Sequence, residues 1–159
     1  MTFEEIIGKL GEDAGSKGGY QADEDGVVRL VFDDEFFVGL MEAEEHGLLL
    51  MWCPVAELPP SGGEKLAVEL LKANHFGRAT AGGTLSVSDE GVVFIQRQMS
   101  LSGTEYEDFR KGLEGLVGTA VQWRQLIESC RAEGLDDESV QSRKTDELHR
   151  AESGDFLKV

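Results

Sequence analysis

Apolar and polar residues alternate along the chain in two periods, one typical of helices and one of strands. Near the N-terminus, apolar positions three and four residues apart predict a helix with one apolar face. This helix begins after Thr2, because residues 2–5 (TFEE) have the T-x-x-E form of a capping box. The clearest helical pattern runs from about 104 to 132. Its broad apolar stripe comprises Tyr106, Phe109, Leu113, Leu116, Val117, Ala120, Val121, Trp123, Ile127 and Cys130.

The region between these two helices predicts five strands and one further helix. Three runs are rich in Val, Phe and Leu and are separated by short acidic turns, which favours antiparallel hairpins. These runs span 27–32, 36–43 and 48–55. A helix follows from about Glu64 to Asn74, and two more strand-like runs begin at Thr84 and Val92. The sequence therefore predicts an α+β fold, a five-stranded antiparallel sheet with helices in the order α-β-β-β-α-β-β-α.

The C-terminal part differs from the rest in composition. After Gly134 the chain is polar, with Val140 and Leu148 as apolar anchors in a segment whose composition suits a helix. We therefore expect a folded domain over residues 1–132, followed by a C-terminal helical tail over residues 133–159.

The first three strands are apolar on both faces, so turn lengths must decide which side chains face the core. Turns of two residues at 33–34 and four residues at 44–47 predict a wholly apolar core face: Val28, Leu30, Phe32, Phe37, Met41, Leu48, Leu50 and Trp52. The second face would then carry Val27, Arg29, Val31, Phe36, Val38, Leu40, Glu42, Leu49, Met51, Cys53 and Val55. A one-residue slip would exchange the faces. The chain's own helices, the tail, a second subunit or a bound partner could cover this second face.

Composition narrows the classes of partner. The formal net charge is −16 over 159 residues. Nucleic acid and anionic lipid both require basic surfaces, so the charge argues against either as a partner. The acidic N-terminus and the absence of an apolar run near ~20 residues argue against a signal peptide or a membrane span. We expect a cytoplasmic protein in which Cys53 and Cys130, lacking CxxC spacing, are small core residues.

The sequence offers no strong candidate for a catalytic site. His46, His75 and His149 are not spaced with Cys or acidic residues as metal ligands, and no G-x-S-x-G elbow is present. Asn74 and His75 are adjacent, so on a helix they point about 100° apart. We interpret this pair as the end of the 64–74 helix rather than as a catalytic pair. The sequence therefore predicts no enzyme, no catalytic or metal-binding residues and no cofactor.

The order of elements and several local words resemble the class I type III secretion chaperones of the CesT/Tir type. The words are LLKANHF at residues 70–76, GGTLSV followed by VVFI at 82–95, and Leu116, Val117, Ala120 and Trp123 in the last helix. The resemblance covers roughly residues 2–132. It implies a bacterial homodimer that binds the N-terminal region of a secreted effector and keeps it soluble and partly unfolded for export, without ATP.

This resemblance, combined with the predicted faces, nominates binding residues. The expected client-binding residues are Phe3, Ile6, Leu10, Val31, Phe36, Val38 and Leu40. The expected dimer interface contains Leu66, Leu70 and Leu71. Each of these could instead belong to the internal core. The alternative function is a chaperone-fold regulator that binds a folded partner, and a small hydrolase is a more distant third.

Overall fold

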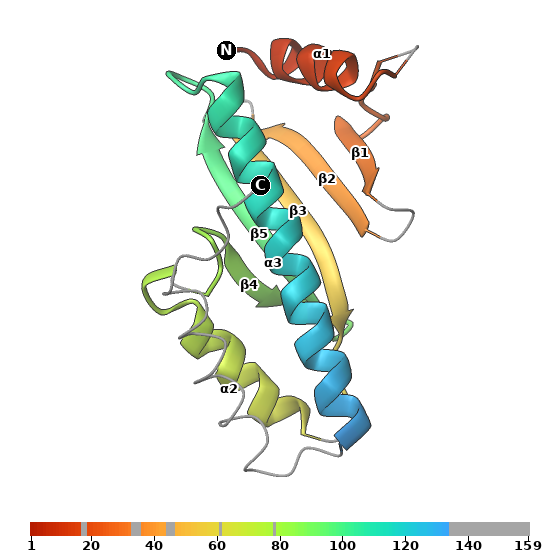
Figure 1. Ribbon diagram of the computed structural model, residues 1–159, viewed down its shortest axis with the longest axis vertical. Coiled ribbons are helices and arrows are strands. Elements are labelled where there is room, and N and C mark those ends of the chain that lie inside the picture. Colours follow the sequence, from red (N-terminus) through yellow and green to blue (C-terminus); the bar gives the residue numbers. More distant parts are fainter. Residues whose placement is uncertain (17–18, 33–35, 44–46, 61, 78, 134–159) are drawn as a thin grey trace, which may run out of the picture.

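The computed structural model describes residues 1–16, 19–32, 36–43, 47–60, 62–77 and 79–133. The elements follow the predicted order (Figure 1): α1 (Phe3–Asp13), β1 (Val27–Phe32), β2 (Phe36–Ala43), β3 (Leu48–Glu57), α2 (Gly63–Ala73), the short 3-10 helix η2 (His75–Gly77), β4 (Thr84–Val87), β5 (Val92–Ser100) and α3 (Tyr106–Glu133). The predicted α+β class is confirmed. The predicted helix at 134–159 lies outside the described residues.

The five strands form one antiparallel sheet in the order β1-β2-β3-β5-β4, so β1 and β4 are its two edges. Phe32 pairs with Phe36, which leaves three residues between β1 and β2 instead of the predicted two. The predicted orientation of β1 is correct, with Val28 and Leu30 in the core. The orientations predicted for β2 and β3 are wrong, because the extra turn residue exchanges their faces relative to β1.

The helices cover one face of this sheet, which we call the covered face. Figure 1 shows α3 running diagonally across it. The buried side chains include Ile6 from α1, Leu66 and Leu70 from α2, and Phe109, Leu116 and Ile127 from α3. The strands contribute Val28, Leu30, Phe36, Val38, Leu40, Leu49, Met51, Cys53, Val55, Leu85, Val93 and Ile95 to the same core.

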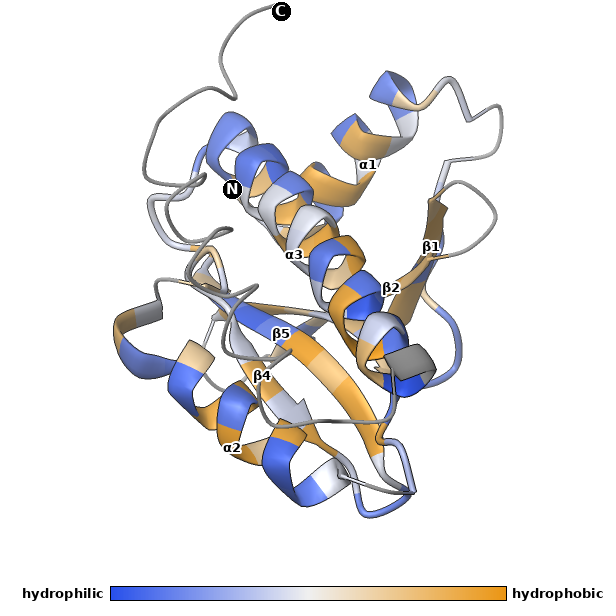
Figure 2. Ribbon diagram, turned by 60° about the horizontal axis from the view of Figure 1, so that its bottom comes forward, coloured by the Kyte–Doolittle hydropathy of each residue, from blue (hydrophilic) through white to orange (hydrophobic). Residues whose placement is uncertain are grey.

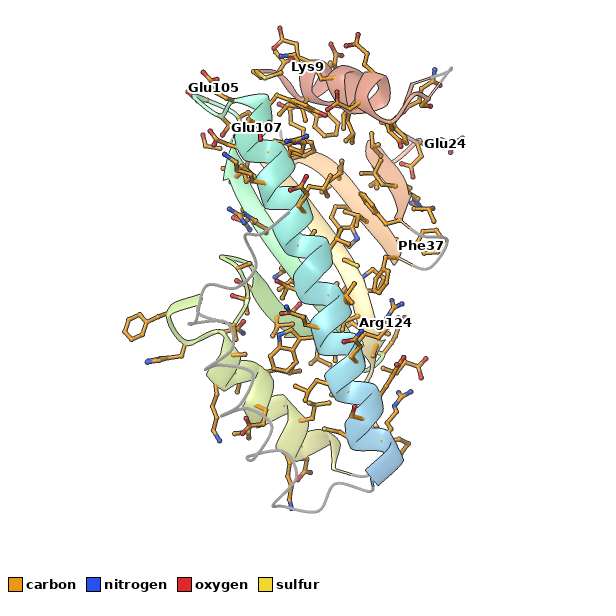
Figure 3. All side chains as sticks on the ribbon, in the orientation of Figure 1. Lys9, Glu24, Phe37, Glu105, Glu107 and Arg124 are labelled. Atoms are coloured by element: carbon orange, nitrogen blue, oxygen red, sulfur yellow. The ribbon has the colours of Figure 1, made fainter. Side chains whose placement is uncertain are left out.

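Polar contacts fix α3 on the sheet. The Arg124 guanidinium donates from Nε to the carbonyl of Val55 at 2.9 Å and stacks 3.8 Å from the centroid of the Phe36 ring. Figure 3 shows Arg124 extending from α3 toward β3. The Trp123 indole donates to the carbonyl of Ala79 at 3.1 Å. These bonds satisfy carbonyls of β3 and of the segment before β4, so they hold both against the helix.

One α3 glycine permits a close approach to β5. A Cβ at Gly112 would lie 2.9 Å from the Met99 sulfur, whereas a Cβ at Gly118 would meet no atom within 4 Å. Gly112 therefore lets the helix lie low over β5, while the structure offers no packing reason for Gly118.

The first helix is fixed at both ends. Thr2 and Glu5 form the predicted capping box, in which the Thr2 hydroxyl accepts from the Glu5 N–H and the Glu5 carboxylate accepts from the Thr2 N–H. At the other end, the Tyr106 hydroxyl of α3 donates to the Asp13 carboxylate at 2.7 Å. Burial and this hydrogen bond raise the pKa of Tyr106 to about 12.

Candidate binding surfaces

No described helix lies on the sheet face opposite the covered face. We call it the open face and define it by its apolar side chains Val31, Phe37, Met41, Leu50 and Trp52. Val31 is 52% exposed and Phe37 is 56% exposed, while the other three are partly buried. Figure 3 shows Phe37 at the β1–β2 side of the sheet. Adjacent exposed apolar residues on one sheet face indicate a surface for a protein partner.

A glycine and a tryptophan shape the middle of the open face. Gly39 and Trp52 are paired across β2 and β3, and a Cβ at Gly39 would overlap the indole ring. The ring therefore lies flat over the Gly39 backbone, as when an aromatic side chain covers a strand glycine. The adjoining positions on β5 are Gln96 and Gln98, which are exposed and polar. Next to Trp52 and Leu50, the β5 part of the open face is thus polar, and the apolar residue Phe94 follows on the same side, paired with Pro54.

The β1 edge beside the open face has unpaired backbone groups. Val27 bonds away from β2, because its N–H donates to the Asp23 carboxylate at 3.0 Å and its carbonyl accepts from the Asp23 N–H at 2.9 Å. Hydrogen-bonding direction alternates along an antiparallel strand, so Arg29 and Val31 also present their N–H and C=O groups outward. Within the described chain, these groups of Arg29 and Val31 have no partner.

Asp23 closes the start of this edge through its carboxylate. Its carboxylate accepts from the N–H groups of Val27 and Asp25 and lies 2.8 Å from the Arg29 guanidinium. The hydrogen bond from Val27 is the main cause that lowers the pKa of Asp23 below its usual value, with smaller contributions from Asp25 and Arg29. Among the described residues, no three His, Cys, Asp or Glu side chains gather closely enough to hold a metal ion.

The other edge, β4, is occupied by side chains. The Asn74 amide donates to the carbonyl of Leu85 at 2.9 Å, and its oxygen accepts from the Leu85 N–H at 2.8 Å. Asn74 is the C-terminal cap of α2, as predicted, and its amide joins the helix end to β4. No local sequence pattern predicts this pairing, because it joins residues eleven positions apart.

Several of the residues nominated for client binding lie in the core of the structure. Phe36, Val38 and Leu40 are buried on the covered face, so their predicted exposure is wrong. Phe3 and Ile6 are also buried, and Leu10 is partly buried. Val31 remains exposed. The prediction missed Phe37 and Trp52, although Gly39, a poor core residue, could have marked this face of β2 as the outer one.

The residues nominated for the dimer interface also differ in exposure. Leu66 and Leu70 are buried in the chain's own core, whereas Leu71 is 70% exposed. Leu71 lies in a shallow depression with Val68, Lys72 and His75, and Phe76 is 82% exposed beside His75, with the two rings 4.2 Å apart. We call these five residues the α2 patch. Figure 2 shows apolar residues interrupting the polar ones along α2, beside β4.

Phe76 adopts a backbone conformation that is rare for a bulky residue. Its φ is +56°, in the left-handed region, which costs roughly 1–2 kcal/mol for a residue with a side chain. A strained, exposed aromatic side chain is a feature of binding sites more often than of neutral surface.

Comparison with known proteins identifies the family of this chain. Residues 5–124 match the Tir chaperone protein (CesT) family. The chain belongs to that family. The resemblance read from the sequence is thereby confirmed. A protein of Chlamydia pneumoniae is 27% identical over 122 residues, which cover 76% of this chain and 92% of that protein.

Solved structures share the fold of this CesT-family chain. A crystal structure of the ExsC–ExsE complex contains a chain with a TM-score of 0.69 and 22% identity, covering 80% of this chain and 97% of that one. The Yersinia pestis type III secretion chaperone SycH, in complex with a fragment of YscM2, has a TM-score of 0.63 and 17% identity, covering 76% and 98%. Within the described residues, no helix combines the length and apolar composition needed to cross a membrane.

Proposed function

We propose that this CesT-family chain is a cytoplasmic bacterial chaperone that binds an extended N-terminal segment of a secreted effector. The observation that carries the proposal is the β1 edge, where Arg29 and Val31 have unpaired outward N–H and C=O groups next to the exposed apolar side chains of Val31 and Phe37. A polypeptide in β conformation supplies both the hydrogen bonds that this edge lacks and apolar side chains for the open face.

The client forms a sixth strand beside β1. Its backbone pairs with Arg29 and Val31, and every second side chain falls on the open face, where Val31, Phe37 and Trp52 bury it. Such a client segment must be extended, with the N–H and C=O groups along one side free to pair with β1. The chaperone thus keeps the client segment partly unfolded and hides its apolar residues.

No nucleotide is required in this mechanism. Burial of apolar area and the formation of strand hydrogen bonds supply the free energy that offsets the ordering of the client. The formal charge of −16 keeps the complex soluble through mutual repulsion. Binding is therefore expected to show a negative heat-capacity change and a modest dependence on salt.

The chaperone is a homodimer through the α2 patch. Val68 and Leu71 are 49% and 70% exposed on the outer side of α2, and Phe76 adds a strained exposed ring at the end of the same patch. A second copy related by a two-fold axis places the same apolar residues against each other and removes them from water. Leu71→Glu is expected to shift the protein toward monomer in sedimentation equilibrium, whereas a wild-type protein that is already monomeric would contradict this interface.

The client site is tested with two substitutions at one position. Val31→Pro removes the outward N–H, which an edge strand tolerates, and prevents strand addition. Val31→Ala keeps that N–H and loses side-chain contact alone. The client is identified first, by mass spectrometry of polypeptides from the native host that wild-type bait retains and Val31→Pro bait loses.

Calorimetry with the N-terminal segment of that client then measures each contribution. We expect Val31→Pro to abolish binding and Val31→Ala to weaken it about tenfold or less, with affinities unchanged by ATP. Circular dichroism checks that both variants are folded. Equal binding by a folded Val31→Pro protein would overturn strand addition at β1.

A further inference from the structure

The two edges of the sheet are in different states. At β1, two successive outward residues, Arg29 and Val31, have free backbone groups. At β4, the outward groups of Leu85 are both bonded to the Asn74 side chain, at 2.8 and 2.9 Å. A primary amide carries one acceptor and one donor in the same geometry as a peptide group, so Asn74 substitutes for one residue of a neighbouring strand.

A second side chain extends this closure. Gly83, two residues before Leu85, donates its N–H to the carbonyl of Thr80 at 2.8 Å, and its own carbonyl accepts from the Thr80 hydroxyl at 2.7 Å. Thr80 is 1% exposed, so solvent does not compete for this bond. Of the three outward-facing residues 83, 85 and 87, two are therefore already paired.

We infer that Asn74, with Thr80, closes the β4 edge and leaves β1 as the edge of this sheet that accepts a strand. An open β4 would be complementary to the open β1 of another copy, because each would present unpaired N–H and C=O groups. Pairing of β1 with β4 is heterologous, and heterologous contacts continue from copy to copy into rings or open-ended assemblies. Asn74 prevents that assembly. Its role in directing a client to β1 rests on the proposed function, but its role in preventing self-association does not.

The wild-type protein provides a first test, by amide hydrogen exchange in the absence of any client. The Leu85 amide is expected to exchange more slowly than those of Arg29 and Val31, by about tenfold or more after correction for sequence. Leu85 exchange as fast as that of Arg29 would show that Asn74 does not hold this edge, and would overturn the inference.

The second test uses Asn74→Ala, which opens the edge, and the isosteric Asn74→Asp, whose carboxylate still accepts from Leu85 N–H but cannot donate to its carbonyl. Analytical ultracentrifugation over a concentration series should show large species for Asn74→Ala and fewer for Asn74→Asp. In the double variant Asn74→Ala with Val31→Pro, these species should disappear, because β1 is then blocked.

The outcomes separate a closed edge from a loss of stability. Assemblies that persist in the double variant do not use β1, and they would contradict the inference. A folded Asn74→Ala protein with the wild-type size distribution would contradict it equally. If Asn74→Ala fails to fold, the inference is tested by the ultracentrifugation of Asn74→Asp and by the amide exchange rate of Leu85 in the wild-type protein. A client that fails to bind the wild-type protein would refute the proposed function and leave these results standing.

Discussion

The covered and open faces of the sheet are built from the same strands, and their side chains differ less in apolarity than in what lies over them. On β2, Val38 and Leu40 point to the covered face and are at most 1% exposed, while Phe37 between Phe36 and Val38 is 56% exposed. In an antiparallel sheet with one face exposed to solvent, the strands normally place polar residues on that face. We therefore attribute the apolar residues on the open face to the proposed client binding, whereas those on the covered face form the core of the fold.

The largest expected effect comes from placing a charge on each face at adjacent positions. Val38→Asp buries a carboxylate beneath the helices and should lower the free energy of unfolding by about 4 kcal/mol or more. Phe37→Asp should change it by less than about 1 kcal/mol and abolish client binding. Urea denaturation with calorimetry measures both. Comparable destabilisation by the two variants would remove the distinction between the faces.

Paired glycine substitutions examine the covered face more finely. Gly118→Ala places a methyl group in open space and should stabilise the protein by up to about 1 kcal/mol through helix propensity. Gly112→Ala brings its Cβ within 2.9 Å of the Met99 sulfur, so this gain should be cancelled or reversed. Thermal unfolding of the two variants should place Gly118→Ala above the wild type and Gly112→Ala at or below it. The opposite order would contradict the close packing of α3 on β5.

Gly39→Ala applies the same logic to the open face. The added methyl group displaces the Trp52 indole, which can move into solvent, so the cost in unfolding free energy should be about 1 kcal/mol or less. Client affinity should fall because the flat surface over Gly39 is lost. Unchanged affinity, with a shifted Trp52 emission spectrum as proof of displacement, would show that the indole does not contact the client.

The reactivity of thiols on the two faces distinguishes them chemically, with the smallest expected effect on stability. Burial raises the pKa of the Cys53 thiol on the covered face to about 11, so at pH 8 it carries little thiolate and should react slowly with a disulfide reagent. A cysteine introduced as Phe37→Cys should react rapidly in the same protein. Rapid modification of native Cys53 at pH 8 would contradict its placement.

The sequence predicted elements better than faces, for a physical reason. Helical periodicity and the Thr2 capping box are local signals, and they located α1 and α3 within a few residues. In β1, Arg29 marked the outer side. In β2 the outward Phe37 and inward Phe36 are chemically identical, so hydropathy could not distinguish them and a turn length misjudged by one residue reversed the assignment.

Contacts between distant segments were beyond the reach of the sequence. The Asn74 amide bonds to Leu85 because η2, with its left-handed Phe76, turns the chain back along α2, and no periodic pattern encodes that turn. Leu66, Leu70 and Leu71 were nominated for the dimer by resemblance to the chaperone family, but Leu66 and Leu70 are buried in the chain's own core and Leu71 alone is exposed. A hydrophobic stripe identifies a buried side of a helix but does not say what buries it.

Acrylamide quenching of tryptophan fluorescence, with and without the client segment, tests the open face most directly. Trp123 is 5% exposed in the core and Trp52 is partly buried on the open face, so the quenchable emission of the free protein reports mainly Trp52. Acrylamide is neutral, so the acidic surface does not bias its access. Binding of the client is expected to shift the Trp52 emission to shorter wavelength and to remove most of the quenching. Full quenching that persists in a calorimetrically saturated complex would show that the client binds elsewhere, and would contradict the open face as its site.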